Sequence, residues 1–212
     1  MGAIEDPKFR MTYGSQLPGG EEEIGWAWFD TKQYVSGTTN QLSFFDTVNS
    51  DKTRGNMELA GTFAAPKYFV TYAVRILPLV IPTVQTTATQ TTAIINIWRD
   101  IFRLMFLSRF LLTIGSKLYL DMPSHMFPAG SGISGFSAQS IFGVTTAQKD
   151  ANMYANHGTP DPKSVYTLAR PRLIESQINF VVNLMWNAPV TLDGGNTDIQ
   201  VMLDGVLYRP IQ

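Results

Sequence analysis

The sequence contains no cysteine among its 212 residues. This absence excludes disulfide bonds, thiolate zinc sites, iron–sulfur clusters and cysteine nucleophiles. Charged residues are also scarce, at 16% of the chain against about 25% in an average soluble domain. So few charges leave a weakly polar surface, and surfaces of that kind often lie against partner molecules.

The sequence also lacks an excess of positive charge. Its formal net charge is −1, with an isoelectric point near 6.1. Residues 1–23 are predicted to form an extended N-terminal arm, which mixes both signs of charge and ends in three glutamates. Such an arm is not a polybasic genome-binding tail, so we expect no strong nucleic-acid binding.

A long uncharged apolar run is missing as well. The most apolar stretch is Ala93–Ile114, and it is interrupted by Arg99, Asp100, Arg103 and Arg109. No uncharged segment within it approaches the roughly 18 residues that a membrane-spanning helix needs. We therefore interpret this stretch as part of a protein core.

What the sequence does contain is alternation of apolar and polar residues with a period of two. This pattern is typical of β-strands that cover a core with one face, and it recurs about eight times, as in a two-sheet sandwich or roll. The predicted strands are Ile24–Phe29, Leu42–Phe45, Glu58–Phe63, Lys67–Ile76, Arg109–Leu120, Val165–Leu168, Ser176–Trp186 and Thr197–Gly205. The side chains predicted to share one core are Tyr72, Val74, Ile114, Phe180, Val182, Val201 and Leu203.

Two segments depart from this period. Apolar residues at helical spacing predict a helix over Thr92–Phe106, with a stripe of Ile94, Ile97, Trp98, Ile101, Leu104 and Met105 facing the sandwich. Asn96, Arg99, Asp100 and Arg103 occupy the opposite side, which we expect to face water or a neighbouring subunit. Asp121–Lys163 is rich in Pro, Gly, Ser and Ala without clear periodicity, so it is predicted to be one long loop.

The stretch "AGSGISGFSA" contains a G-x-G-x-x-G pattern at Gly130, Gly132 and Gly135. A dinucleotide site needs a strand before the first glycine and a helix after the third. Two prolines precede this pattern, and the residues after it are too short for such a helix, so loop glycines are the better interpretation. "GISG" also lacks one residue of the G-x-S-x-G nucleophile motif.

Other chemistry-bearing residues each have a plainer interpretation. His125 and His157 lie 32 positions apart in the predicted loop, without the carboxylate partners of a metal site. Asp193 and Asp204 precede glycines, and Asp-Gly is above all a turn signal. The four tryptophans could form a sugar-binding row, but each falls on the apolar phase of its element, so core burial is expected: Trp26, Trp28, Trp98 and Trp186. We therefore predict no catalytic, cofactor-binding or metal-binding residues.

The order of these features resembles that of a known family. An N-terminal arm is followed by "LSFFDTV", then "MELAGTFAAPKYFVTYAVRIL", a helix between strands and a long Pro/Gly loop. The chain then continues with "INFVVNLMWNAPVTL" and "TDIQVMLDGVLYRPIQ". Over 41–212 this arrangement resembles the jelly-roll capsid (coat) proteins of tailless icosahedral, internal-membrane-containing bacteriophages, although 212 residues fit a single roll and not the double roll that many such phages use.

The resemblance implies an all-β fold, with a single eight-stranded antiparallel jelly-roll domain over residues 24–212. It further implies a capsid subunit of the virion, assembled in the host cytoplasm, that is not an enzyme and needs no cofactor. The implied partners are copies of the chain and other capsid proteins, with an internal membrane as a further candidate. Two alternatives stay open: a β-sandwich binding module for carbohydrate or protein, and an enzyme built on a jelly roll.

The arm and the predicted loop carry apolar residues that a solvated linker does not need. These are Phe9, Met126, Phe127, Phe136, Ile141, Phe142 and Tyr154. We expect residues 1–23 and 121–163 to become ordered by contact with neighbouring subunits. Because many modest contacts add up in a lattice, each can be weak in a stable shell.

Overall fold

The computed structural model describes residues 21–79, 100–127, 134–141, 149–156 and 165–210. It is an all-β structure in which residues 100–106 and the short 3₁₀ helix η1 interrupt the strands. The strands and η1 are β1 (Glu21–Tyr34), β2 (Gln41–Phe44), β3 (Tyr68–Leu79), β4 (Ser108–Ile114), β5 (Lys117–Pro123), η1 (Ser124–Met126), β6 (Ser134–Ile141), β7 (Lys149–Asn156), β8 (Tyr166–Ile174), β9 (Phe180–Trp186) and β10 (Thr197–Pro210).

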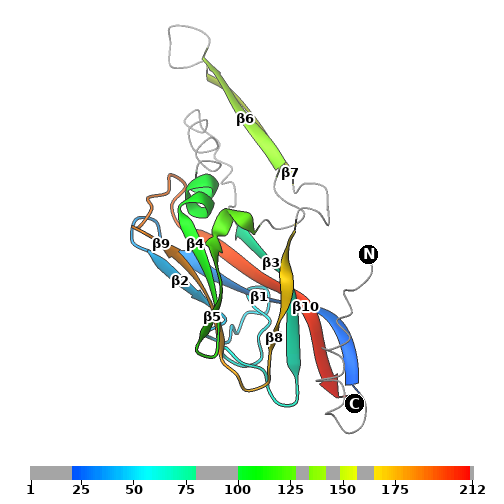
Figure 1. Cartoon of the computed structure of the whole chain (residues 1–212). Helices are drawn as coiled ribbons and strands as arrows, with labels where there is room; N and C mark the ends of the chain where they lie inside the picture. Colours follow the sequence, from blue (N-terminus) through cyan, green and yellow to red (C-terminus); the bar gives the residue numbers. More distant parts are fainter. Residues whose placement is uncertain (1–20, 80–99, 128–133, 142–148, 157–164, 211–212) are drawn as a thin grey trace.

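Eight strands form a sandwich of two antiparallel four-stranded sheets (Figure 1). The strand orders are β1-β10-β3-β8 and β2-β9-β4-β5. The pairs are nested, because β1 pairs with β10, β2 with β9, β3 with β8 and β4 with β5. This is the arrangement of one long hairpin rolled up on itself, which is a jelly roll. The fold class predicted from the sequence is thus confirmed.

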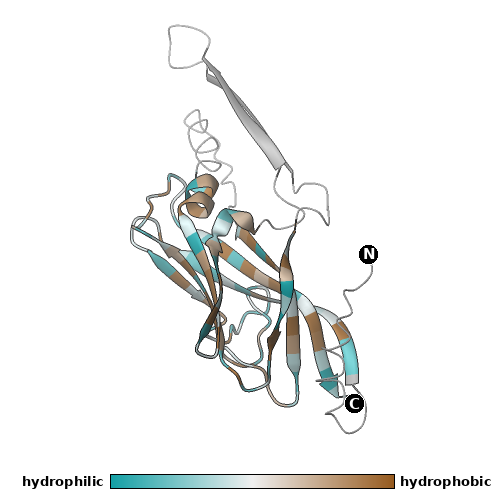
Figure 2. Ribbon diagram, in the orientation of Figure 1, coloured by the Kyte–Doolittle hydropathy of each residue, from teal (hydrophilic) through white to brown (hydrophobic). Residues whose placement is uncertain are grey.

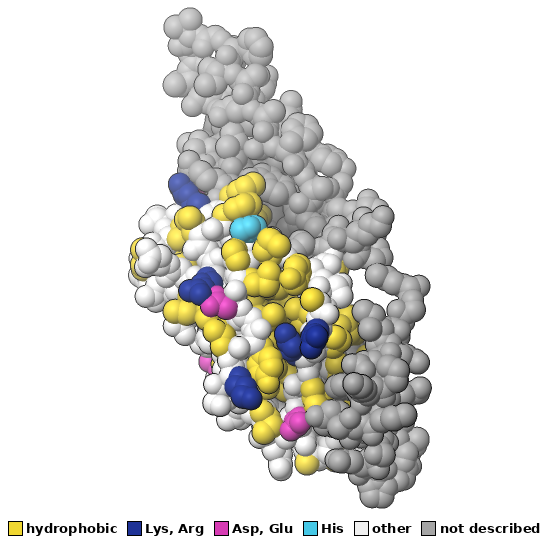
Figure 3. Space-filling view, viewed as in Figure 1, with side chains coloured by type: hydrophobic (Ala, Val, Ile, Leu, Met, Phe, Trp, Pro, Cys, Tyr) yellow, Lys and Arg dark blue, Asp and Glu magenta, His cyan; other side chains and the backbone are white. Residues whose placement is uncertain are grey.

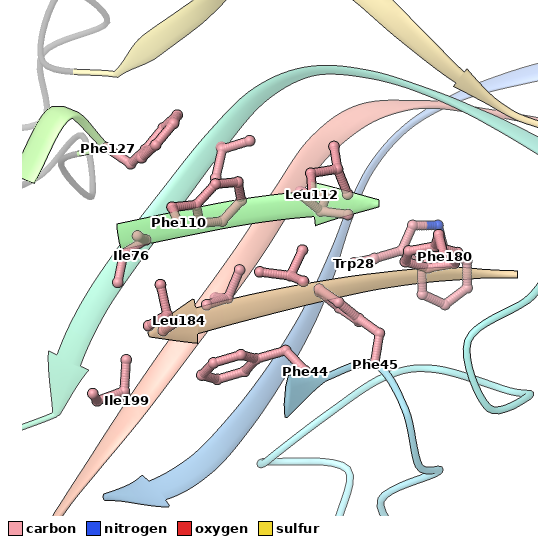
Figure 4. Close-up of a cluster of buried hydrophobic side chains, with 14 of the residues drawn as sticks. Trp28, Phe44, Phe45, Ile76, Phe110, Leu112, Phe127, Phe180, Leu184 and Ile199 are labelled. Carbon is pink, nitrogen blue, oxygen red and sulfur yellow. The ribbon is translucent and has the colours of Figure 1, made fainter. Parts of the chain in front are cut away.

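The core lies between the two sheets and is rich in aromatic residues (Figure 4). Every second residue of β4, β9 and β10 is buried, which gives the banded colouring of these strands in Figure 2. Six of the seven predicted core residues are buried: Val74, Ile114, Phe180, Val182, Val201 and Leu203. The cluster also includes Trp28, Phe44, Phe45, Ile76, Phe110, Leu112, Phe127, Leu184 and Ile199.

The seventh predicted core residue, Tyr72, is 41% exposed, and its prediction was wrong. The register of β3 shifts between Thr71 and Ala73, so Tyr72 has no direct partner on β10 or β8. A β-bulge of this kind reverses which face the following side chains occupy. Before the bulge Phe69 and Thr71 are fully buried, and beyond Ala73 the buried positions of β3 are even-numbered, as at Val74 and Ile76.

A second correction concerns Asp204, which was predicted to lie in a turn. It lies inside β10 and forms an ion pair with Arg75 of β3. The glycine that follows it serves close packing. A Cβ atom added to Gly205 would lie 2.1 Å from the carbonyl oxygen of Val70 and 2.5 Å from the ring of Phe69.

Two predicted strands also differ from the structure. The stretch Arg109–Leu120 is a hairpin of β4 and β5, because Gly115 turns the chain with a φ of +59°. Glu58–Phe63 is not a strand and contains only an isolated bridge between Leu59 and Thr62. Gly61 in this segment donates a backbone hydrogen bond to Phe45 and accepts one from Phe180, so the segment links the residue after β2 to the first residue of β9.

The segment predicted as one loop, 121–163, contains regular structure. It begins with the end of β5 and η1, and it includes β6 and β7, which pair with each other over eight residues each. In Figure 1 this two-stranded ribbon extends away from the sandwich. Its Ser, Gly and Asn content hid the strands, since these residues are poor strand formers.

Residues 100–106 are helical, as predicted, and residues 92–99 lie outside the described residues. In the described ranges, no helix combines the length and apolar character needed to cross a membrane. Of the predicted arm, residues 21–23 belong to β1, and residues 1–20 lie outside the described ranges.

Candidate functional site

The two aromatic side chains with the highest exposed fractions among the described residues lie at one end of the sandwich. Phe102 is 59% exposed, Phe106 is 55% exposed and Leu107 is 58% exposed. The Phe102 and Phe106 rings stack with centroids 4.9 Å apart, and the Phe106 and His125 rings stack at 4.6 Å. Together with Met126, which is 40% exposed, these five residues form what we call the aromatic platform. Figure 3 shows the histidine bordered by hydrophobic side chains.

The helix that carries the platform is fixed by a buried carboxylate. Asp100, only 3% exposed, accepts hydrogen bonds from the backbone N–H groups of Asp193 (3.0 Å) and Gly194 (2.8 Å). Hydrogen bonds from backbone N–H groups to a carboxylate are among the stronger ones in proteins. The turn between β9 and β10 is thus attached to the first residue of the helical segment.

Two further contacts hold the same helix against the sandwich. The Trp186 indole Nε1–H donates to the backbone carbonyl of Leu104 at 3.1 Å, and the Leu104 side chain is fully buried. The Arg103 guanidinium donates to the Thr191 carbonyl at 3.2 Å and to the Asp193 carboxylate at 3.3 Å. With its inner side fixed in this way, the helix presents Phe102 and Phe106 outward in a defined position.

The η1 side of the platform is anchored by Phe127. Its ring is fully buried and packs against Phe110 (centroids 4.6 Å apart) and Tyr166 (5.2 Å). Its backbone carbonyl accepts the N–H of Ile76 in β3 at 3.0 Å. Phe127 therefore serves the core of its own chain, which differs from the predicted role in contacts between subunits.

A shallow open groove continues from the platform along the outer face of the β2-β9-β4-β5 sheet. Its lining includes Phe106, Leu107, Met185 and the ion pair between Arg109 and Asp121. The hydrogen bonds to Asp121 raise the pKa of Arg109, so the guanidinium keeps its charge at any ordinary pH. Because the two charges compensate each other, the border of the platform is close to neutral.

The predicted chemical motifs lie elsewhere or have structural roles. Gly135 lies inside β6, so a strand occupies the place where a dinucleotide site needs a helix, while Gly130 and Gly132 lie outside the described residues. His125 belongs to η1 and is part of the platform through its stacking on Phe106, and His157 is outside the described residues.

Two of the four tryptophans are buried in the core as predicted, and one is not. Trp28 and Trp186 are 3% and 4% exposed, whereas Trp26 is 41% exposed. Trp26 lies on β1, an edge strand with a neighbouring strand on one side only. Trp98 lies outside the described residues, and Asp193 lies in a turn, as its Asp-Gly pair predicted.

Sequence reasoning missed the platform. Asp100 was placed on the outer, polar side of the helix, but it faces inward because the 193–194 turn supplies two N–H donors. The available signal was the i, i+4 pair of Phe102 and Phe106, which falls outside the apolar stripe and is typical of ring contact on a helix surface.

Across the described ranges, no group of three or more His, Asp or Glu side chains is arranged to hold a metal ion. Among the described residues, the aromatic platform is the clearest candidate binding site. An exposed apolar surface of this kind can bind another apolar surface. No protein-family model matches the chain, and comparisons with curated proteins and with solved structures gave no match.

Proposed function

We propose that the protein is a viral structural protein, a capsid subunit that assembles with other copies of itself into an icosahedral shell. The proposal extends to shells of the tailless, internal-membrane-containing bacteriophages that the sequence resembles. In such a shell the sandwich is the rigid unit, and its arm and connections supply the contacts between units.

The observation that carries the proposal is the jelly-roll strand order, β1-β10-β3-β8 over β2-β9-β4-β5. This architecture is shared by viral capsid domains, lectin domains and cupins. Cupin-type chemistry uses metal ligands, and lectin-type binding uses a dedicated polar site. The aromatic platform instead offers an apolar, nearly neutral surface, which favours contact with another protein.

The position of the long connections supports the same function. The helix at residues 100–106 and the β6–β7 ribbon belong to the connections after β3 and β5. Both lie toward the same end of the sandwich in Figure 1. Connections carry binding functions on a rigid scaffold, and here two of them extend the same end of the roll.

Sedimentation velocity over a range of protein concentrations, with negative-stain imaging of the fastest species, tests the proposal. We expect closed particles of uniform size above a threshold concentration. Assembly should change little between low and moderate salt, because few charges are available for screening. A protein that stays monomeric at high concentration would contradict the proposal and favour a stand-alone binding module.

Limited proteolysis gives a second test. Within the predicted segments 1–23 and 121–163, the parts outside β1, β5, η1 and Phe127 should be cleaved quickly in the isolated subunit and protected in the assembled particle, if contacts between subunits order them. Cleavage at the same rate in both states would contradict this role for the two segments.

A further inference from the structure

The aromatic platform and the groove beside it form one continuous apolar surface. Phe106 and Leu107 belong to both, and Met185, which is 42% exposed, extends the surface along the groove. Phe102 stacks on Phe106 and is the most exposed ring of the platform. The surface therefore holds an outward-facing ring stack and a shallow groove side by side, and these are the two halves of a contact that could form between identical surfaces.

Two ion pairs lie beside this surface, and each contains both signs of charge. Arg103 lies 3.3 Å from Asp193, and Arg109 pairs with Asp121. A border of a single sign would repel a second copy of itself. Two Arg–Asp pairs that meet in opposite directions instead place each charge next to its opposite. The charges at the border are thus complementary to those of a second copy.

The exposed area indicates how strong a contact between two such surfaces is. Phe102, Phe106, Leu107, Met126 and Met185 are each between 40% and 59% exposed. Large apolar side chains offer about 100 Å² each at this exposure, so the surface provides roughly 500 Å² per copy. Two copies bury about 1,000 Å² in this way, which is less than the roughly 1,200–2,000 Å² of a stable complex. The contact is therefore weak alone and becomes effective where many copies repeat it.

We propose that the platform and groove of one copy dock on the same surface of a second copy, about a two-fold axis near Phe106 and Leu107. The ring stack of each copy lies in the groove of the other. Such a contact is isologous, because each copy contributes the same residues. The inference rests on the proposed function and identifies one contact between subunits of the shell. Docking removes the exposed rings of both copies from water, which is its main source of free energy.

The absence of cysteine allows a direct test by cross-linking. Leu107→Cys introduces a single thiol near the proposed axis, so a short bismaleimide should join two copies of this one variant. The matched control is Leu118→Cys, at a side chain that is 52% exposed near the β4–β5 turn. We expect at least about tenfold more covalent dimer from Leu107→Cys, because docking raises the effective concentration of the two thiols. Equal yields from the two variants would overturn the inference.

Charged substitutions at Phe106 test the two-fold symmetry. Phe106→Lys/Leu107→Cys carries the same positive charge on both sides of the axis, and Phe106→Glu/Leu107→Cys carries the same negative charge. Each double variant alone should lose the preferential cross-linking by repulsion. An equal mixture of the two, with different affinity tags, should recover it as a mixed dimer, because opposite charges then meet.

Failure of the mixture to recover the cross-link would also overturn the inference, since in a head-to-tail contact Phe106 faces a different residue of the second copy. Circular dichroism checks the fold of each variant, which should be retained because the Phe106 side chain is 55% exposed. The single Leu107→Cys variant leaves the rings unchanged, so its comparison with Leu118→Cys decides the inference even if a charged variant unfolds.

Imaging of the same samples separates this inference from the proposed function. Particles without preferential cross-linking at Leu107→Cys contradict the two-fold contact and leave the capsid proposal standing. Preferential cross-linking without particles supports the two-fold contact and contradicts the shell. The absence of both contradicts both proposals.

Discussion

The Asp100 carboxylate accepts the backbone N–H of Gly194 at 2.8 Å, across 94 positions of sequence. Asp100 also accepts the N–H of Asp193. The position of the platform depends on this attachment, because it ties the helix to the turn between β9 and β10.

Removing that carboxylate should loosen the platform. Asp100→Ala leaves the two N–H groups without their acceptor, and we expect a loss of about 1–3 kcal/mol in the free energy of unfolding. Urea unfolding measures the loss, and hydrogen exchange should become faster in residues 100–107. Glu58→Ala, which removes an exposed partner of Lys67, is the control and should cost less than about 1 kcal/mol. An equal effect of the two changes would contradict the role of Asp100.

Shortening the platform side chains should impair assembly without affecting the fold. In the Phe102→Ser/Phe106→Ser double variant, we expect the concentration needed for assembly to rise at least about tenfold, because the buried aromatic contact is lost. The melting temperature should stay nearly constant, since both rings are exposed in the subunit. Leu118→Ser/Tyr119→Ser removes comparably exposed residues near the β4–β5 turn and should leave assembly intact. Sedimentation and circular dichroism measure the two properties.

A charge placed in the core should unfold the domain. Val182 is fully buried at the centre of β9, and Val182→Asp places an unpaired carboxylate there at a cost of several kcal/mol. That cost is comparable to the whole stability of a typical domain, about 5–15 kcal/mol. The neighbouring Val181 is only half-buried, so Val181→Asp should cost much less. Thermal melting of both variants checks the assignment, and an unchanged melting temperature of Val182→Asp would show it to be wrong.

Gly205 of β10, which lies opposite the bulge in β3, should tolerate no side chain. In Gly205→Ala the new Cβ meets the Val70 carbonyl, a backbone atom that cannot move freely, and we expect a loss of about 3 kcal/mol. A Cβ at Gly25 in β1 would meet no atom within 4 Å, so Gly25→Ala should stay within about 0.5 kcal/mol of the parent protein. Denaturant unfolding compares the two, and equal stabilities would contradict the close packing at Gly205.

Asp30 should give the stability a measurable pH dependence. Burial raises the pKa of its carboxyl group, although the N–H groups of Phe45 and Thr31 and the charge of Lys32 act in the other direction. The folded protein therefore holds this proton to a higher pH than the unfolded chain does. As the pH rises from the usual Asp range through the raised pKa, the contribution of Asp30 to the free energy of unfolding falls.

Comparison with Asp30→Asn isolates this effect. Between about pH 3 and pH 7, the parent protein should lose stability relative to the variant as the pH rises. Asp51 provides a control of opposite sign, because hydrogen bonds from Thr53 lower the pKa of this exposed carboxyl group. Relative to Asp51→Asn, the parent protein should lose stability as the pH falls. A pH-independent difference for Asp30→Asn would show that its pKa is not raised in the folded state.

The sequence predicted the fold class because burial in β4, β9 and β10 follows a strict period of two. The predicted number of roll strands was correct only because two errors cancel. The predicted strand Arg109–Leu120 is two strands, β4 and β5, and the predicted strand Glu58–Phe63 is not a strand. The bulge at Tyr72 could not be predicted in this way, because nothing in the alternation of β3 marks where its phase reverses. Only the pairing with two neighbouring strands reveals it.

The candidate site was harder to predict, because it depends on contacts between distant parts of the chain. Helical periodicity places Asp100 on the polar side, and only the folded turn at 193–194 makes a buried carboxylate favourable there. Once Asp100 faces inward, Phe102 and Phe106 must face outward. Local sequence patterns describe each segment alone, so they cannot report a partner more than 90 positions away.

The nested pairing has a consequence for how the protein is made. The central strand β10, which separates β1 from β3, is the last roll strand to leave the ribosome. At typical rates of synthesis, roughly 8 to 30 seconds pass between Tyr34 and Thr197. During that time β1, and later β3 once it has been synthesised, has an unpaired edge, which is a template for misassociation with other nascent chains. The arrival of residues 197–210 pairs both edges at once, so completion of this single strand ends the period in which they are exposed.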